Sequence, residues 1–172
     1  MTESAANGAT PPQPQQGTAQ IALQKIYVKD ASFEAPSAPA IFQEDGQSNL
    51  QLNMSQKVGA VGENVYEVVL TITLTCTLGD KTAYLAEVQQ AGIFGLNGFD
   101  PRVLEGVLAT YCPNVLFPYA RQAISDMVQN GGFAPYFLQP INFDQIYAEQ
   151  LRRRGDQAQQ GAAAEAPAVG SA

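Results

Sequence analysis

The segment from Val65 to Leu78 constrains the fold of this chain more than any other, because its side chains alternate between apolar and polar. Alternation with a period of two residues is typical of a β-strand that has one face in the core and one face in water. The apolar face comprises Tyr66, Val68, Leu70, Ile72, Leu74, Cys76 and Leu78, and the polar face comprises Glu67, Thr71, Thr73, Thr75 and Thr77. This strand predicts an antiparallel sheet with one solvent-facing side.

Neighbouring segments supply the other strands of this sheet. The sequence Leu78-Gly79-Asp80-Lys81 has the composition of a tight turn. The segment 82–94 is therefore predicted to return as the next strand of a hairpin. Segments 21–33 and 50–55 are two further strand candidates. We expect a four-stranded antiparallel sheet.

The C-terminal third predicts helices that cover the apolar face of the sheet. Asp100 is a good N-cap and Pro101 suits the first helical position, so a helix is expected over 100–111. A second helix is expected over 118–129, ended by two glycines, and a third is expected to begin at Asn142. Strands followed by helices indicate the α+β class: a four-stranded antiparallel sheet with one solvent-facing side, covered by C-terminal helices.

The chain has the length of one domain, which we expect over residues 20–154. Segments 1–19 and 155–172 are rich in Pro, Gln, Ala and Gly, and we predict both to be disordered tails because they offer little large apolar surface. The N-terminal segment does not resemble a secretory signal, and no segment has the ~20 apolar residues of a membrane-spanning helix. We therefore expect a cytoplasmic protein without direct membrane insertion.

The composition argues against several classes of function. Histidine is absent, and the two cysteines, Cys76 and Cys112, are too far apart for a Cys-x-x-Cys pair. No glycine motif for phosphate binding occurs. We therefore expect no catalytic site, no metal and no cofactor, and we interpret both cysteines as buried free thiols.

The net charge of the chain is −7, and the segment 20–150 is strongly acidic. Between Gln20 and Gln150 there are thirteen carboxylates and six Lys or Arg residues. Nucleic acid is not an expected partner, because phosphate binding requires a basic surface. An acidic surface keeps a protein soluble and also attracts basic partners.

Strand parity predicts where part of this acidity lies. Asp30 and Glu34 share one side of the first strand, and Leu85 and Glu87 share one side of the fourth. The polar face of the sheet would then be acidic, with Leu85 as an apolar contact point. Two interpretations remain open: a merely solvated face, or a docking surface for a small basic partner.

Two loops carry exposed apolar candidates. The proline-stiffened segment 35–40 leads into Ile41 and Phe42, and segment 131–140 carries Phe133, Tyr136, Phe137 and Leu138 without helical periodicity. Such residues either plug the core or line an apolar groove. These features favour a binding protein over an enzyme.

Three motifs, in this order and spacing, resemble the SecB family of bacterial protein-export chaperones. They are YVKDASFEAP at 27–36, EVQQAGIF at 87–94 and YCPNVLFPYAR at 111–121, and the resemblance covers about residues 21–151. It implies an ATP-independent holding chaperone that binds unfolded secretory precursor proteins and delivers them to the SecA motor ATPase.

The resemblance also implies specific sites. The zinc-bearing C-terminal tail of SecA would dock on the polar sheet face at Asp30, Glu34, Leu85 and Glu87. The first helix, with Val103, Leu104, Val107 and Leu108, would lie between the two dimers of a homotetramer. The client groove is placed by segment, and its candidates are Ile41, Phe42, Leu50, Leu52, Met54 and Phe137.

Two alternative functions remain open. One is a SecB-like chaperone dedicated to a single client, such as an antitoxin. The other is an α+β protein that binds a small molecule with its aromatic loop.

Overall fold

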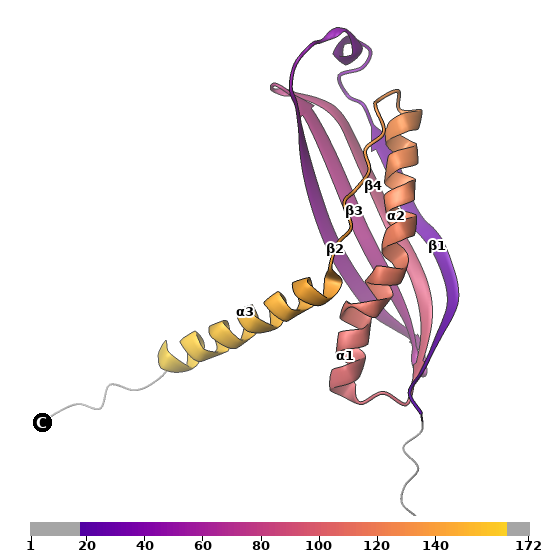
Figure 1. Cartoon of the computed structure of the whole chain (residues 1–172), viewed down its shortest axis with the longest axis vertical. Coiled ribbons are helices and arrows are strands. Elements are labelled where there is room, and N and C mark those ends of the chain that lie inside the picture. The colour runs from indigo at the N-terminus through magenta and orange to yellow at the C-terminus, as the bar shows by residue number, and fades with distance from the viewer. Residues whose placement is uncertain (1–17, 165–172) are drawn as a thin grey trace, which may run out of the picture.

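Four long antiparallel strands form one sheet in the computed structural model, which describes residues 18–164 (Figure 1). The strands are β1 (Gln20–Glu34), β2 (Ser48–Gly62), β3 (Val65–Leu78) and β4 (Lys81–Asn97), in the spatial order β1-β4-β3-β2. Helices α1 (Pro101–Ala109), α2 (Tyr111–Asn130) and α3 (Phe143–Ala164) follow, and the short 3-10 helix η1 (Ala40–Gln43) lies between β1 and β2. The predicted α+β class and four-stranded sheet are confirmed.

Strand β2 is much longer than the predicted segment 50–55. Its polar and glycine-containing second half stays paired with β3, from Gln56 opposite Leu70 to Gly62 opposite Val65. The strand continues there because β3 offers backbone partners along its whole length, which outweighs the weak strand preference of the side chains.

Helix α2 begins at Tyr111, seven positions before the expected start at Pro118, and passes through that proline. Helix α1 has the predicted cap, since the Asp100 side chain accepts a hydrogen bond from the Arg102 backbone N–H at 2.9 Å. Helix α3 has a similar cap, in which Asn142 Oδ1 accepts from the Gln145 backbone N–H at 3.0 Å.

Helix α3 also continues past Arg154 to Ala164, where the sequence predicted a disordered tail from residue 155 on. Alanine and glutamine favour helix, and lengthening an existing helix avoids the cost of nucleation. The other predicted tail segments, 1–17 and 165–172, lie outside the described residues. No helix in the described part of the chain is long and apolar enough to cross a membrane.

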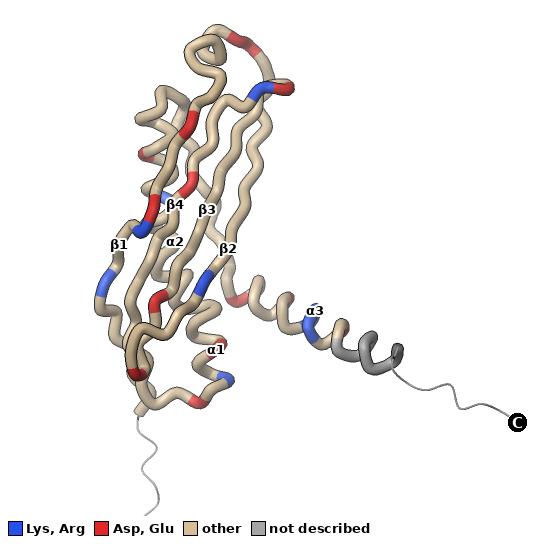
Figure 2. The backbone as a smooth tube through the Cα atoms, turned by 180° about the vertical axis from the view of Figure 1, so that it is seen from behind, with Lys and Arg blue, Asp and Glu red and all other residues tan. Residues whose placement is uncertain are grey.

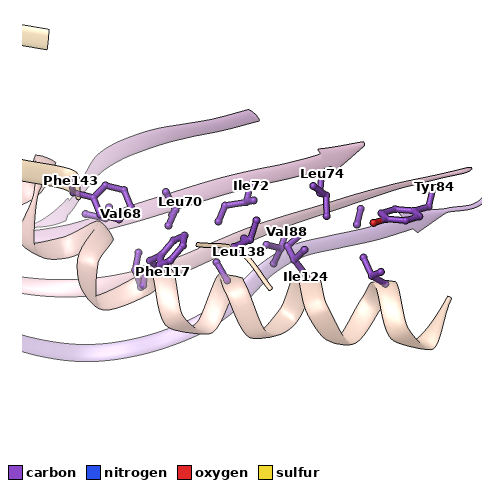
Figure 3. Packing of buried hydrophobic residues seen from close by; sticks show 14 of the residues in the cluster. Val68, Leu70, Ile72, Leu74, Tyr84, Val88, Phe117, Ile124, Leu138 and Phe143 are labelled. Carbon is purple, nitrogen blue, oxygen red and sulfur yellow. The ribbon is translucent and has the colours of Figure 1, made fainter. Parts of the chain in front are cut away.

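The core lies between one face of the sheet, here called the inner face, and α2 (Figure 3). The predicted apolar residues of β3 supply it: Val68, Leu70, Ile72 and Leu74 are fully buried. Leu116, Ala120, Ile124 and Val128 of α2 pack against them from the other side. Figure 1 shows α2 running along the sheet, whereas α3 projects away from it.

Candidate functional site: an acidic face and an apolar hollow

The opposite side of the sheet, here called the outer face, carries no helix of the described residues 18–164 (Figure 2). The strand register places all four predicted docking residues on this face. Glu34 lies opposite Leu85, Asp30 lies opposite Gln89, and Glu87 lies opposite Ser32, which is between Asp30 and Glu34 in β1. Residues directly opposite one another in an antiparallel pair point to the same face. The three carboxylates and Leu85 therefore form one patch, here called the acidic patch.

The carboxylates of the acidic patch differ in how they are held. Asp30 and Glu34 are exposed, whereas Glu87 is half-buried and accepts a hydrogen bond from Thr73 Oγ1 at 2.8 Å. Among the described residues, no Lys or Arg forms an ion pair with any of the three. No cation of the described residues therefore neutralises the patch by an ion pair.

A β-bulge at Lys29 sets the orientation of the acidic patch. The register shifts between Val28, opposite Gln90, and Asp30, opposite Gln89. Gln90 is 2% exposed, and its Nε2 donates to the Tyr27 carbonyl at 2.9 Å beside the bulge. Because a bulge adds one residue to a strand, it changes which later residues face outward. Tyr27 and Asp30, three positions apart, thus share the outer face.

Next to the acidic patch, three side chains form a network that spans three strands, here called the Tyr27–Lys29–Glu67 network. Lys29 Nζ lies 2.7 Å from Glu67 Oε2 and 2.9 Å from Oε1. The Tyr27 hydroxyl also donates to Oε1. The hydrogen bond from Lys29, followed by that from Tyr27, lowers the pKa of Glu67, and the bond to Glu67 raises the pKa of Tyr27.

On the helix side, an apolar hollow of about 320 Å³ opens where η1 approaches the segment after α2. Aromatic rings form its wall: Phe133 lies 4.8 Å from Tyr84 and 5.0 Å from Phe42 between ring centroids. The lining residues are Ile41, Phe42, Ser48, Leu50, Cys76, Leu78, Ala83, Tyr84, Phe133, Ala134, Pro135 and Tyr136. Such a hollow suits an apolar side chain.

Two polar groups of this hollow, the Cys76 thiol and the Tyr84 phenol, are buried. Burial raises the pKa of both Cys76 and Tyr84, so the thiol and the phenol stay protonated. Burial likewise raises the pKa of Cys112, in the first turn of α2, to about 12. Both cysteines are free and buried, as predicted.

The six predicted groove residues do not share one hollow. Phe42 and Leu50 line it with large exposed surfaces, while Ile41 lines it but is 5% exposed and belongs mainly to the core. Leu52 and Met54 extend from it along the inner face of β2, which α2 leaves uncovered. Phe137 instead lines a separate hollow beside Phe117, Pro118 and Arg121 of α2.

The sequence-based reasoning missed Tyr84, Cys76 and Leu78 as lining residues. All three belong to apolar strand patterns that indicate ordinary core positions, and nothing in the pattern marks where the covering helix ends. Phe133 and Tyr136, the aromatic residues of the irregular segment 131–140, do line the hollow, so aromatic residues without helical periodicity are an informative signal.

Helix α1 offers a further apolar surface. Val103 is 54% exposed, and Leu104, Val107 and Leu108 are half-buried. No residue of α1 is fully buried within the protomer. An apolar helix that its own chain covers so little is suited to contact another copy.

Comparisons with known proteins agree with the motif resemblance. The family model described as preprotein translocase subunit SecB matches residues 14–154. The protein-export protein SecB of Stenotrophomonas maltophilia is 52% identical over 172 residues, covering 100% of both chains. That of Xanthomonas euvesicatoria is 54% identical over 154 residues, covering 90% of this chain and 91% of its own.

Among solved structures, a SecB-like chaperone of Mycobacterium tuberculosis, in complex with a ChAD peptide from the HigA1 antitoxin, has a similar fold. The TM-score is 0.60 at 18% identity, covering 71% of this chain and 91% of that one.

Proposed function

The chain belongs to the SecB family of protein-export chaperones, and we propose that it holds unfolded precursor proteins in the cytoplasm without ATP until export. The observation that carries this proposal is the apolar hollow at Phe42 and Tyr84, continued by the exposed Leu50 and Leu52 of β2. An extended client chain would place apolar side chains along this surface. Burial contributes about 25 cal/mol per Å² before the cost of ordering.

Binding of this kind selects the unfolded state, because only unfolded chains expose successive apolar side chains. The experiment mixes the pure protein with an unfolding client and follows aggregation by light scattering without nucleotide. We expect suppression at stoichiometric amounts. Unchanged aggregation of several unrelated clients, with one client protected, would support the dedicated-client alternative. Tight binding of a small molecule with no client protected would support a ligand-binding protein.

The second part of the proposal concerns delivery. The acidic patch of Asp30, Glu34, Glu87 and Leu85 has the charge and the apolar contact point that a small basic segment needs, and we assign it to the C-terminal tail of SecA. Ionic docking weakens as salt rises, whereas apolar client capture does not. Loss of both activities at the same salt concentration would contradict two separate sites.

The third part concerns assembly. We propose a homotetramer in which the α1 surface of Val103, Leu104, Val107 and Leu108 lies between dimers. Light scattering of the full chain at micromolar concentration tests the mass. Val107→Asp should divide the tetramer into dimers, whereas Arg102→Asp, at an exposed position of the same helix that is not apolar, should not. A tetramer that survives Val107→Asp would place the interface elsewhere.

A further inference from the structure

The Tyr27–Lys29–Glu67 network lies directly beside the acidic patch. Lys29 is the residue before Asp30, and both face outward at the bulge: Lys29 contacts Glu67, and Asp30 lies opposite Gln89. Figure 2 shows acidic and basic segments of β1 side by side on this face. A cation so close to the patch would reduce its attraction for a basic partner.

The contacts of Lys29 direct its charge away from the patch. Its ammonium is bonded to both oxygens of Glu67 on β3, two strands away, at 2.7 and 2.9 Å. Glu67 lies opposite Ile93, whereas Glu87 lies six positions earlier along β4. Asp30 lies opposite Gln89, four positions earlier than Ile93. At about 3.4 Å per strand residue, Glu67 is offset from Asp30 by about 14 Å and from Glu87 by about 20 Å along the strand direction, beyond the Debye length of about 8 Å at physiological salt.

The network is built into the sheet. Tyr27 on β1 donates to Glu67 on β3, so its side chain crosses β4. Ala91 and Val69, opposite Tyr27 in the register, are 0% and 5% exposed although they lie on the outer face. The Glu67 carboxylate is thus held by a second hydrogen-bond donor, the Tyr27 hydroxyl.

We propose that Glu67 is a positioning residue for the acidic patch: by holding the Lys29 ammonium, it keeps that cation away from Asp30 and leaves the patch free to attract a basic partner. This inference rests on the proposed docking function. It assigns to Glu67 a role that acts through Lys29 without contact with the partner. Without Glu67, the nearest carboxylate for the Lys29 ammonium along the chain is Asp30.

Lys57 supplies a matched control. It is exposed on the same face, and its charge also acts on Glu67. It lies on β2, opposite Val69, at the far edge of the sheet from β1. A released Lys57 is too far from Asp30 to neutralise it, although its charge equals that of Lys29.

The experiment measures the Kd of a peptide from the zinc-bearing C-terminal tail of SecA for full-length variants at low salt. Glu67→Gln should raise the Kd about threefold, the size of an exposed ion-pair effect. Adding Lys29→Met to Glu67→Gln should restore the Kd, and adding Lys57→Met should not. Equal rescue by both lysine substitutions would mean that only net charge matters, and an unchanged Kd for Glu67→Gln would also overturn the inference.

Two further measurements separate the possible failures. Glu87→Lys tests the docking surface itself: if it leaves the Kd unchanged, the proposed docking site is wrong, whatever the result at Glu67. Nuclear magnetic resonance of the lysine ammonium groups in the unaltered protein does not depend on any variant folding. The Lys29 ammonium should reorient more slowly than that of Lys57, and equal mobility would contradict the holding role of Glu67.

Discussion

The two faces of the sheet use the same strands for opposite kinds of surface. The inner face is apolar, and α2 covers only its middle, so Leu50 and Leu52 of β2 remain exposed. The outer face carries no helix, and its side chains are mainly threonine, glutamine and charged residues. The difference shows how one layer of backbone can support apolar capture on one side and ionic docking on the other.

The two kinds of binding also differ physically, in the distance over which they act and in their response to salt. Apolar capture needs contact and depends on buried area. Ionic docking acts over several ångströms and is screened by salt. Substitutions on one face should therefore leave the activity of the other face intact, unless they disturb the backbone that both share.

The largest expected effect comes from the shared core. Leu74 is 0% exposed, and Leu74→Ala should lower the free energy of unfolding by about 2–5 kcal/mol because it leaves a cavity. Denaturant unfolding measures this change. Capture and docking should then fail together on warming. Thr75→Ala, one position along β3 on the outer face, should lower the free energy of unfolding far less. Equal losses of stability in the two variants would mean that the core does not lie on the inner face alone.

The next effect tests the outer face. Glu87→Lys places a cation in the acidic patch and should weaken binding of the SecA tail peptide about tenfold, mostly through repulsion. Calorimetric titration measures the Kd, and light scattering should show unchanged client capture. Glu63→Lys makes the same charge change at the exposed turn between β2 and β3 and serves as the control. A variant that unfolds would make Glu87 a structural residue.

A smaller effect should define the inner face. Phe42 packs against Phe133 with tilted rings at the edge of the hollow, whereas the more exposed Phe137 lines a separate hollow. We expect Phe42→Ser to lower client affinity severalfold, and Phe137→Ser to lower it less. Client affinity is measured with a fluorescently labelled unfolded protein. The reverse order would move the groove toward the hollow beside α2.

The smallest effect concerns pH. Since the folded-state pKa of Glu67 is lowered, its contribution to stability is present above the unfolded value of about 4.3 and is lost as pH falls through the folded value. The Lys29 side chain is 45% exposed, so solvent screens the pair, and we expect its contribution to the free energy of unfolding to be less than about 1 kcal/mol. Thermal midpoints of the unaltered protein and Glu67→Gln should converge once the pH falls below the lowered folded-state pKa of Glu67. A constant difference down to acidic pH would mean that the carboxylate charge is irrelevant.

Much of this protein follows from its sequence by periodicity. The alternation of β3 and the Asp100 cap predicted the class of fold. The two-residue spacing of Leu85 and Glu87 predicted that they share one face of the sheet. These signals are local in the sequence. The family resemblance then proposed roles for those residues. The local signals were too weak to predict two features: the continuation of α3 beyond Arg154 and the full length of β2.

Three features were decided by tertiary structure alone. The bulge at Lys29 lies between β1 and β4, where Gln90 of β4 donates to the Tyr27 carbonyl. Without the bulge, Asp30 would not share a face with Tyr27. The hollow at Tyr84 exists because α2 ends before it covers the end of the sheet, which no strand pattern records. The Lys29–Glu67 pair joins residues 38 positions apart. Each depends on contacts between segments distant in the chain, and a single sequence carries no local signal for them.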